Sequence, residues 1–65
     1  MAAIGEVLAR HTPRLLALPG VLGVAEGEAD GAPCIVVFVA SDAQPPPQLP
    51  AVIEGYLVVV RRTGA

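Results

Sequence analysis

The sequence contains a single cysteine, Cys34, a single histidine, His11, and no lysine or tryptophan. One cysteine excludes a disulfide within the chain. Structural zinc needs four ligands, so a Cys/His zinc site is not expected, and neither is any other metal or cofactor. Phe38 and Tyr56 are the only aromatic residues, and the net charge is −2. Nucleic-acid-binding modules usually combine a basic face with stacking aromatics, so no nucleic acid is expected as a partner.

Long apolar runs and a basic leader are missing as well. The longest apolar run, residues 34–40, is much shorter than the roughly 20 residues of a membrane-spanning helix. Residues 1–10 include Glu6 and have neither a basic start nor an apolar stretch. These features predict no contact with a membrane, no signal peptide and a cytoplasmic location.

What the chain does have is a high apolar content in a short length. It has 65 residues, 54% hydrophobic and 15% charged, which indicates one folded domain over residues 1–65. Such a small domain hides only about 60% of the surface of its unfolded chain. With no disulfide or zinc to support it, association with another chain is the remaining source of stability.

The first segment has the periodicity of an amphipathic helix over residues 2–18. Its apolar residues share one stripe: Ile4, Val7, Leu8, Leu15 and Leu18. Pro13 interrupts the pattern, so the helix either kinks there or restarts with Thr12 as its N-cap. Glu6 and Arg10 stand four residues apart on a more polar side, and Pro19-Gly20 ends the segment.

Two strands, residues 21–28 and 34–40, surround an Asp30-Gly31 dipeptide that is typical of a two-residue hairpin turn. This turn places Ala25 opposite Val36 and Gly23 opposite Phe38. The face expected to meet the helix holds Leu22, Val24, Ile35, Val37 and Val39. The other face holds Val21, Gly23, Ala25, Gly27, Cys34, Val36, Phe38 and Ala40.

The remainder of the chain predicts a connector and one more strand. Residues 45–50 contain four prolines and favour an extended connector, and residues 51–55 are expected to form one helical turn. Residues 56–62 form the last strand, which is free to pair with either strand of the hairpin. The fold class expected is α+β: a single small domain with an N-terminal helix on a three-stranded sheet that includes a β-hairpin, in the order α-β-β-β.

The last strand is apolar on both faces, which is typical of a strand that is buried on both sides. Leu57 and Val59 point one way and Tyr56, Val58 and Val60 the other. One helix covers only one face of a sheet, so the second face is expected to meet a partner, most simply a second copy of the chain. The predicted contact residues are Val36, Phe38, Tyr56 and Val58.

No side chain presents a convincing catalytic pattern, and no catalytic, cofactor-binding or metal-binding residue is assigned. His11 needs a carboxylate or nucleophile nearby to act as a base, and Glu6 is not on its face. Cys34 opens an apolar strand without a resolving cysteine, which is typical of a buried, inert thiol. The acidic residues Glu26, Glu28 and Asp30 are too few for calcium. The four arginines, Arg10, Arg14, Arg61 and Arg62, would suit an anion only if the fold gathered them.

One resemblance covers residues 15–64. The string Leu18-Pro19-Gly20-Val21-Leu22-Gly23-Val24, the Asp30-Gly31 pair, the run Ile35–Val39 and the spacing of Leu49, Pro50, Ile53, Gly55 and Val58 carry it. The chain resembles a small α/β module that occurs alone and also ahead of trypsin-like serine peptidase domains in bacteria. Ala25 replaces the second glycine of the usual Gly-Val-Gly repeat. No peptidase triad carries over, so the resemblance implies a standalone accessory or interaction domain.

Together these observations predict a small non-enzymatic module for interaction or oligomerisation, with a homo-oligomer or a protein as its partner. The alternative is a subunit of a small homo-oligomeric enzyme or ligand-binding protein with its site between chains.

Overall fold

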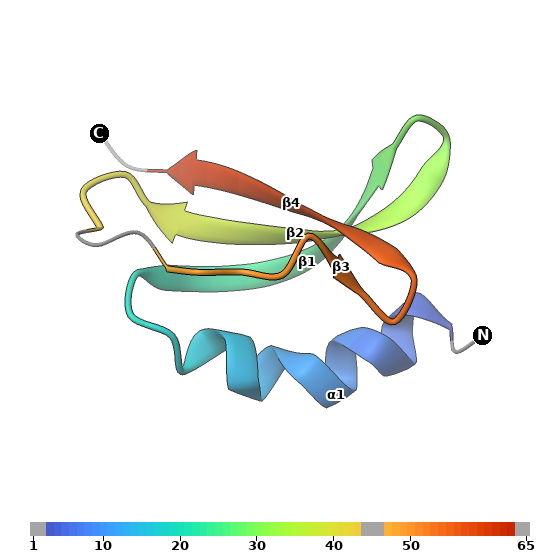
Figure 1. The fold of residues 1–65 in the computed structure, drawn as a ribbon, viewed down its shortest axis with the longest axis horizontal. Helices are drawn as coiled ribbons and strands as arrows, with labels where there is room; N and C mark the ends of the chain where they lie inside the picture. Colours follow the sequence, from blue (N-terminus) through green and yellow to red (C-terminus); the bar gives the residue numbers. More distant parts are fainter. Residues whose placement is uncertain (1–2, 44–46, 64–65) are drawn as a thin grey trace.

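A helix lies on one side of a mixed sheet (Figure 1). The computed structural model describes residues 3–43 and 47–63. Helix α1 spans Ile4–Leu16, and the strands are β1 (Val21–Ala29), β2 (Ala32–Ala40), β3 (Val52–Ile53) and β4 (Tyr56–Thr63). The strand order is β1-β2-β4-β3. This confirms a small α+β domain with an N-terminal helix and a β-hairpin, but the sheet has four strands where three were predicted.

Helix α1 runs through Pro13 as one element, so of the two alternatives left open by the sequence, the restart at Thr12 is wrong. The stripe of apolar residues is confirmed, because Val7 and Leu15 are buried and Ile4, Leu8 and Leu18 pack against the same core. The helix ends in a tightened turn in which the amide of Leu18 donates to the carbonyl of Leu15 at 3.1 Å. It therefore stops before Pro19-Gly20, as the sequence indicates.

The β1–β2 hairpin has the predicted turn and the predicted register. Asp30 and Gly31 adopt φ values of 53° and 79°, the left-handed conformation that a two-residue turn requires. Gly23 pairs with Phe38 and Ala25 with Val36. The register shifts between Val21 and Gly23, where β1 contains a bulge.

This bulge changes the predicted face of two residues. Val21 pairs with Val39 and packs against the core, although the alternation predicted it on the opposite face. Leu22 is the extra residue and remains 60% exposed, so its predicted place in the core is wrong. The cause is that an inserted residue interrupts the two-residue alternation of side chains along a strand.

Strand β4 runs parallel to β2, which settles the pairing that the sequence left open. Val58 pairs with Ile35 and Val60 with Val37.

The predicted helical turn over residues 51–55 is wrong: Val52–Ile53 forms β3, which pairs with β4 across a second tight turn. The predicted proline connector falls partly on residues 44–46, which lie outside the described residues.

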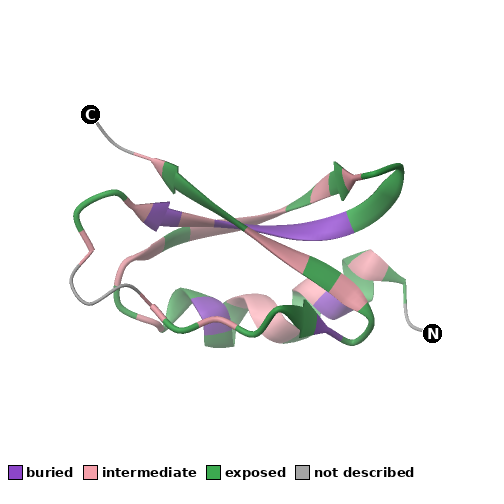
Figure 2. Cartoon of the chain, turned by 45° about the horizontal axis from the view of Figure 1, so that its top comes forward, coloured by how far each residue is buried: buried purple, intermediate pink, exposed green. Residues whose placement is uncertain are grey.

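The core lies between α1 and the sheet (Figure 2). It consists of Val7, Leu15, Ile35, Val37, Val39 and Ile53. Ile53 brings the second hairpin into the same core as the helix and the central strand. Within residues 3–43 and 47–63, α1 is neither long nor apolar enough to cross a membrane.

Candidate functional site

The face of the sheet turned away from α1, called here the open face, is the first candidate. Of the residues predicted to contact a partner there, Val36 and Phe38 do lie on it, because their neighbours Ile35, Val37 and Val39 point into the core. Tyr56 and Val58 lie on the other side and pack against the core. The parallel pairing of Val58 with Ile35 gives both side chains the same face. The fold therefore divides the predicted contact set into two pairs.

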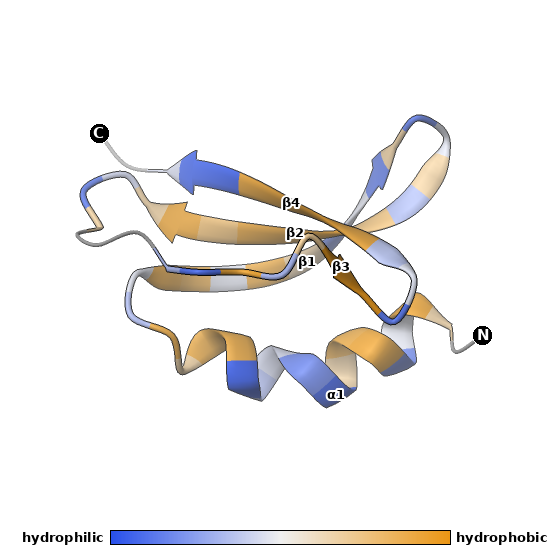
Figure 3. Cartoon of the chain, in the orientation of Figure 1, coloured by the Kyte–Doolittle hydropathy of each residue, from blue (hydrophilic) through white to orange (hydrophobic). Residues whose placement is uncertain are grey.

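The open face contains other apolar side chains in place of Tyr56 and Val58. Leu57 and Val59 alternate with them along β4, and Val52 pairs with Leu57 in the second hairpin. Val52 is 54% exposed and Leu57 48%, while Phe38 and Val59 are half-buried. Apolar residues extend along most of β2 and β4, and the end of β4 is hydrophilic (Figure 3). We call Phe38, Val52, Leu57 and Val59 the open-face patch.

Part of the open face is covered by the sheet itself. A Cβ atom at Gly27 would lie 2.6 Å from Cγ2 of Val36 and 3.4 Å from Sγ of Cys34, so Val36 fills the space above this glycine. Val36 is 8% exposed and Cys34 2% as a result. Phe38 lies against Gly23, with its Cδ2 atom 3.9 Å from a Cβ built there. The accessible apolar surface is therefore shifted toward β4 and the second hairpin.

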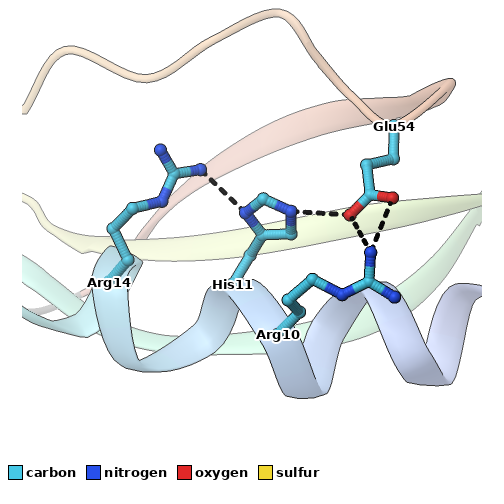
Figure 4. Close-up of polar contacts among 4 residues, drawn as sticks. All are labelled: Arg10, His11, Arg14 and Glu54. Atoms are coloured by element: carbon cyan, nitrogen blue, oxygen red, sulfur yellow. Dashed lines mark hydrogen bonds and ion pairs between the residues drawn. The ribbon is translucent and has the colours of Figure 1, made fainter.

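The second candidate is a polar cluster that joins α1 to the turn after β3 (Figure 4). Glu54 accepts hydrogen bonds from Nη1 of Arg10 at both carboxylate oxygens, at 3.1 and 3.2 Å. Its Oε2 atom also lies 2.8 Å from Nε2 of His11. Nη2 of Arg14 lies 2.8 Å from Nδ1 of His11. The carboxylate that contacts His11 is therefore Glu54, from the second hairpin, and not Glu6 of the same helix.

The contact with Arg14 settles which nitrogen of a neutral His11 carries the proton. A guanidinium has only donors, so Nδ1 must accept the hydrogen bond from Arg14. Nε2 then carries the hydrogen and donates it to Glu54. In this state the lone pair of the imidazole is occupied by Arg14 and is not available as a base.

The backbone that presents Glu54 is costly for this residue type. Glu54 has a φ of 47° and Gly55 a φ of 87°, as in a two-residue hairpin turn. Positive φ is uncommon for residues other than glycine, and asparagine and aspartate tolerate it best. The hydrogen bonds from Arg10 and His11 offset this cost, because they fix the carboxylate against α1.

The remaining candidate residues are not brought together with either site. Cys34 is buried, as predicted for an inert thiol. Glu26, Glu28 and Asp30 are exposed near the first hairpin turn. Arg61 and Arg62 lie at the far end of β4, in register with Phe38 and Val39, so the four arginines do not form one group. The described part of the chain contains neither a pocket nor a group of three metal-ligating side chains.

Sequence reasoning missed Glu54, which links the helix to the second hairpin. The available signal was the Glu54-Gly55 dipeptide directly before an aliphatic run, which has the spacing of a tight turn but an unusual first residue. The ion pair with Arg10 joins residues 44 positions apart, and no local pattern reveals such a contact.

In comparisons with known proteins, no family model, no curated protein and no solved structure matches this chain.

Proposed function

We propose that this protein is a non-enzymatic interaction module that associates with a second copy of itself through the open-face patch. The single observation that carries the proposal is that Val52 and Leu57 remain about half exposed on the same apolar sheet face as Phe38 and Val59. No helix or strand of the described ranges, 3–43 and 47–63, packs over this face.

A second copy suits this patch because the patch is self-complementary. In a two-fold interface the same surface contributes from both chains, so a charge close to the two-fold axis would face the same charge on the other copy. The patch itself has no charged side chain, and Arg61, in register with Phe38, lies toward the end of β4. An apolar centre with a charged residue at the edge is the usual anatomy of a protein interface.

The small core supports the same proposal. The helix and sheet bury only a few large side chains fully, and the largest of these are Leu15, Ile35 and Val7. A single core in a chain of 65 residues supplies a few kcal/mol at most, about 3–5 kcal/mol. Burying Val52 and Leu57 between two copies adds apolar contact where the monomer has little.

Light scattering after size-exclusion chromatography tests the proposal directly. Over about a hundredfold range of concentration, the wild-type chain is expected to reach twice its own mass, with the dimer fraction rising by mass action. Leu57→Glu places a charge at the centre of the interface and is expected to give a monomer at every concentration. A wild-type chain that stays monomeric throughout contradicts the proposal.

Val60→Glu is the matched control. Val60 lies on the same strand, is also 48% exposed and alternates to the helix side of the sheet. The same change at Val60 is expected to leave the dimer intact. If both variants dissociate equally while circular dichroism shows both folded, the interface lies elsewhere on β4.

A further inference from the structure

Arg14 is the arginine of the polar cluster whose charge has no carboxylate partner among the described residues. Arg10 binds both oxygens of Glu54, whereas Arg14 donates to the ring nitrogen of His11. Arg14 itself is exposed, and its other terminal nitrogen points away from the imidazole (Figure 4). A guanidinium bound to a neutral ring nitrogen keeps its positive charge and most of its donors available.

His11 changes from acceptor to donor when it takes up a proton. Nδ1 then carries a hydrogen that cannot coexist with the hydrogen bond from Arg14. Nε2 keeps its hydrogen bond to Glu54, which becomes an ion pair. Protonation therefore leaves two donors, the Nδ1–H group and the Arg14 guanidinium, beside each other with no acceptor between them.

We propose that Arg14 and His11 form a binding site for a phosphate-type oxyanion and that filling this site takes up one proton at His11. The anion accepts two hydrogen bonds from the guanidinium of Arg14 and one from Nδ1 of His11. The proton comes from the solvent and no covalent bond changes. Before binding, the same two side chains are held together by their own hydrogen bond at 2.8 Å.

The charges of the cluster match a phosphate dianion. With His11 protonated, the cluster contains three cations, Arg10, His11 and Arg14, and one carboxylate, Glu54, which leaves a charge of +2. The charged groups around His11 are Arg10 and Arg14 from α1 and Glu54 from the second hairpin turn. Glu26 and Glu28 share the helix side of β1 but are exposed and take part in none of the ion pairs of the described residues.

Glu54 positions the site without contacting the anion. Its carboxylate holds Nε2 of His11, so Nδ1 is directed toward Arg14. Arg10 binds the same carboxylate and balances its charge, which reduces its repulsion of an incoming anion. This role also explains why a glutamate occupies position 54, where the positive φ would cause less backbone strain for glycine or asparagine.

Titration with inorganic phosphate, followed by NMR and calorimetry, tests the inference. We expect saturable binding that shifts the signals of residues 10–14 and 54 and strengthens as the pH is lowered, because filling the site takes up a proton. Calorimetry in two buffers of different ionisation enthalpy is expected to show proton uptake. Before phosphate is added, ring nitrogen shifts should identify the Nε2–H tautomer.

Arg14→Gln is expected to weaken phosphate binding by about tenfold or more, because a charge-assisted pair is lost. The matched control is Arg62→Gln, which removes the same charge from the end of β4 and should leave the affinity unchanged. His11→Gln retains a polar side chain but cannot take up a proton, so proton uptake should vanish while weak binding remains.

Several results would overturn the inference. Equal losses in Arg14→Gln and Arg62→Gln would mean that phosphate responds only to the overall charge. Arg14 lies in the last turn of α1, where a cation also stabilises the helix end. If Arg14→Gln lowers the melting temperature without changing phosphate affinity, this structural role is the only one.

Two further measurements are needed. The first distinguishes a lipid headgroup from free phosphate as the source of the anion, and the second distinguishes phosphate binding from self-association. Vesicles of phosphatidylcholine with and without phosphatidic acid show whether a lipid headgroup binds more tightly than free phosphate. Repeating the phosphate titration with Leu57→Glu separates the site from self-association, because that variant is expected to be monomeric and still bind phosphate. Loss of phosphate binding in this monomer would contradict a site complete within one chain.

Discussion

The two hairpin turns of this protein have the same backbone form but different origins. Asp30-Gly31 and Glu54-Gly55 both place two successive residues at positive φ. The first turn is flanked by Ala29 and Ala32, and nothing lies within 4 Å of a Cβ built at Gly31. The second turn lies between Ile53, which is 4% exposed, and the Tyr56 that pairs with it and packs on the core.

The comparison shows two ways in which a chain specifies the same turn. In the first hairpin, a favourable dipeptide between two nine-residue strands is sufficient. In the second, a two-residue strand and an unfavourable glutamate depend on Ile53 in the core and on Arg10 and His11 at the surface. The first turn is therefore local, and the second is held by contacts with α1 and the core.

The largest effect is expected from removing the core anchor of the second hairpin. Ile53→Ala deletes a side chain that is 4% exposed and should lower the free energy of unfolding by about 2–5 kcal/mol. Urea unfolding followed by circular dichroism measures the loss. Val60→Ala, on a residue that is 48% exposed, is the control and should change stability little. Equal losses in the two variants would mean that the second hairpin does not depend on its core contact.

The next effect concerns the glycines, where the two turns should behave alike. Gly31→Ala and Gly55→Ala each force alanine into a φ near the observed 79° and 87°. We expect each to lower the free energy of unfolding by about 1 kcal/mol, because the left-handed conformation is strained for alanine. Thermal unfolding of both variants measures this. A loss at one position alone would show that the two backbones are not equivalent.

The smallest effect should distinguish the turns by sign. Glu54→Gln removes the charge that Arg10 and His11 contact on a partly exposed side chain, and should cost about 0.2–1 kcal/mol. Asp30→Asn should be neutral or slightly stabilising, because asparagine suits positive φ and Asp30 is exposed. Urea titrations at low and high salt measure both. Added salt should reduce the cost at Glu54, and a loss that is insensitive to salt would contradict an electrostatic origin.

The same distinction between local and distant interactions separates the correct from the incorrect sequence predictions. The helix stripe and the first hairpin register depend on residues close in sequence, and both were predicted. The position of Tyr56 and Val58 on the helix side of the sheet was predicted wrongly, because it depends on how β4 pairs with β2. An apolar strand has no polar side that would indicate which face meets the core. A bulge at Leu22 likewise leaves no signal in a run of apolar residues and glycine.

The polar cluster could be predicted only in part. Arg10, His11 and Arg14 lie on one helix, and each was considered as a candidate from the sequence, but not as members of one cluster. Their contact with Glu54 depends on the second hairpin. A strand of only two residues has too short a pattern for this hairpin to be predicted from the sequence.

By itself, the sequence determined one small α+β domain, the apolar stripe of α1 and the first hairpin with its register. It could do so because helical periodicity and an Asp-Gly turn act over a few residues. Only the tertiary structure decided the parallel pairing of β4, the composition of the open face and the contact of His11 with Glu54. These features depend on contacts between distant segments, whose side chains meet only after the sheet has formed on the helix.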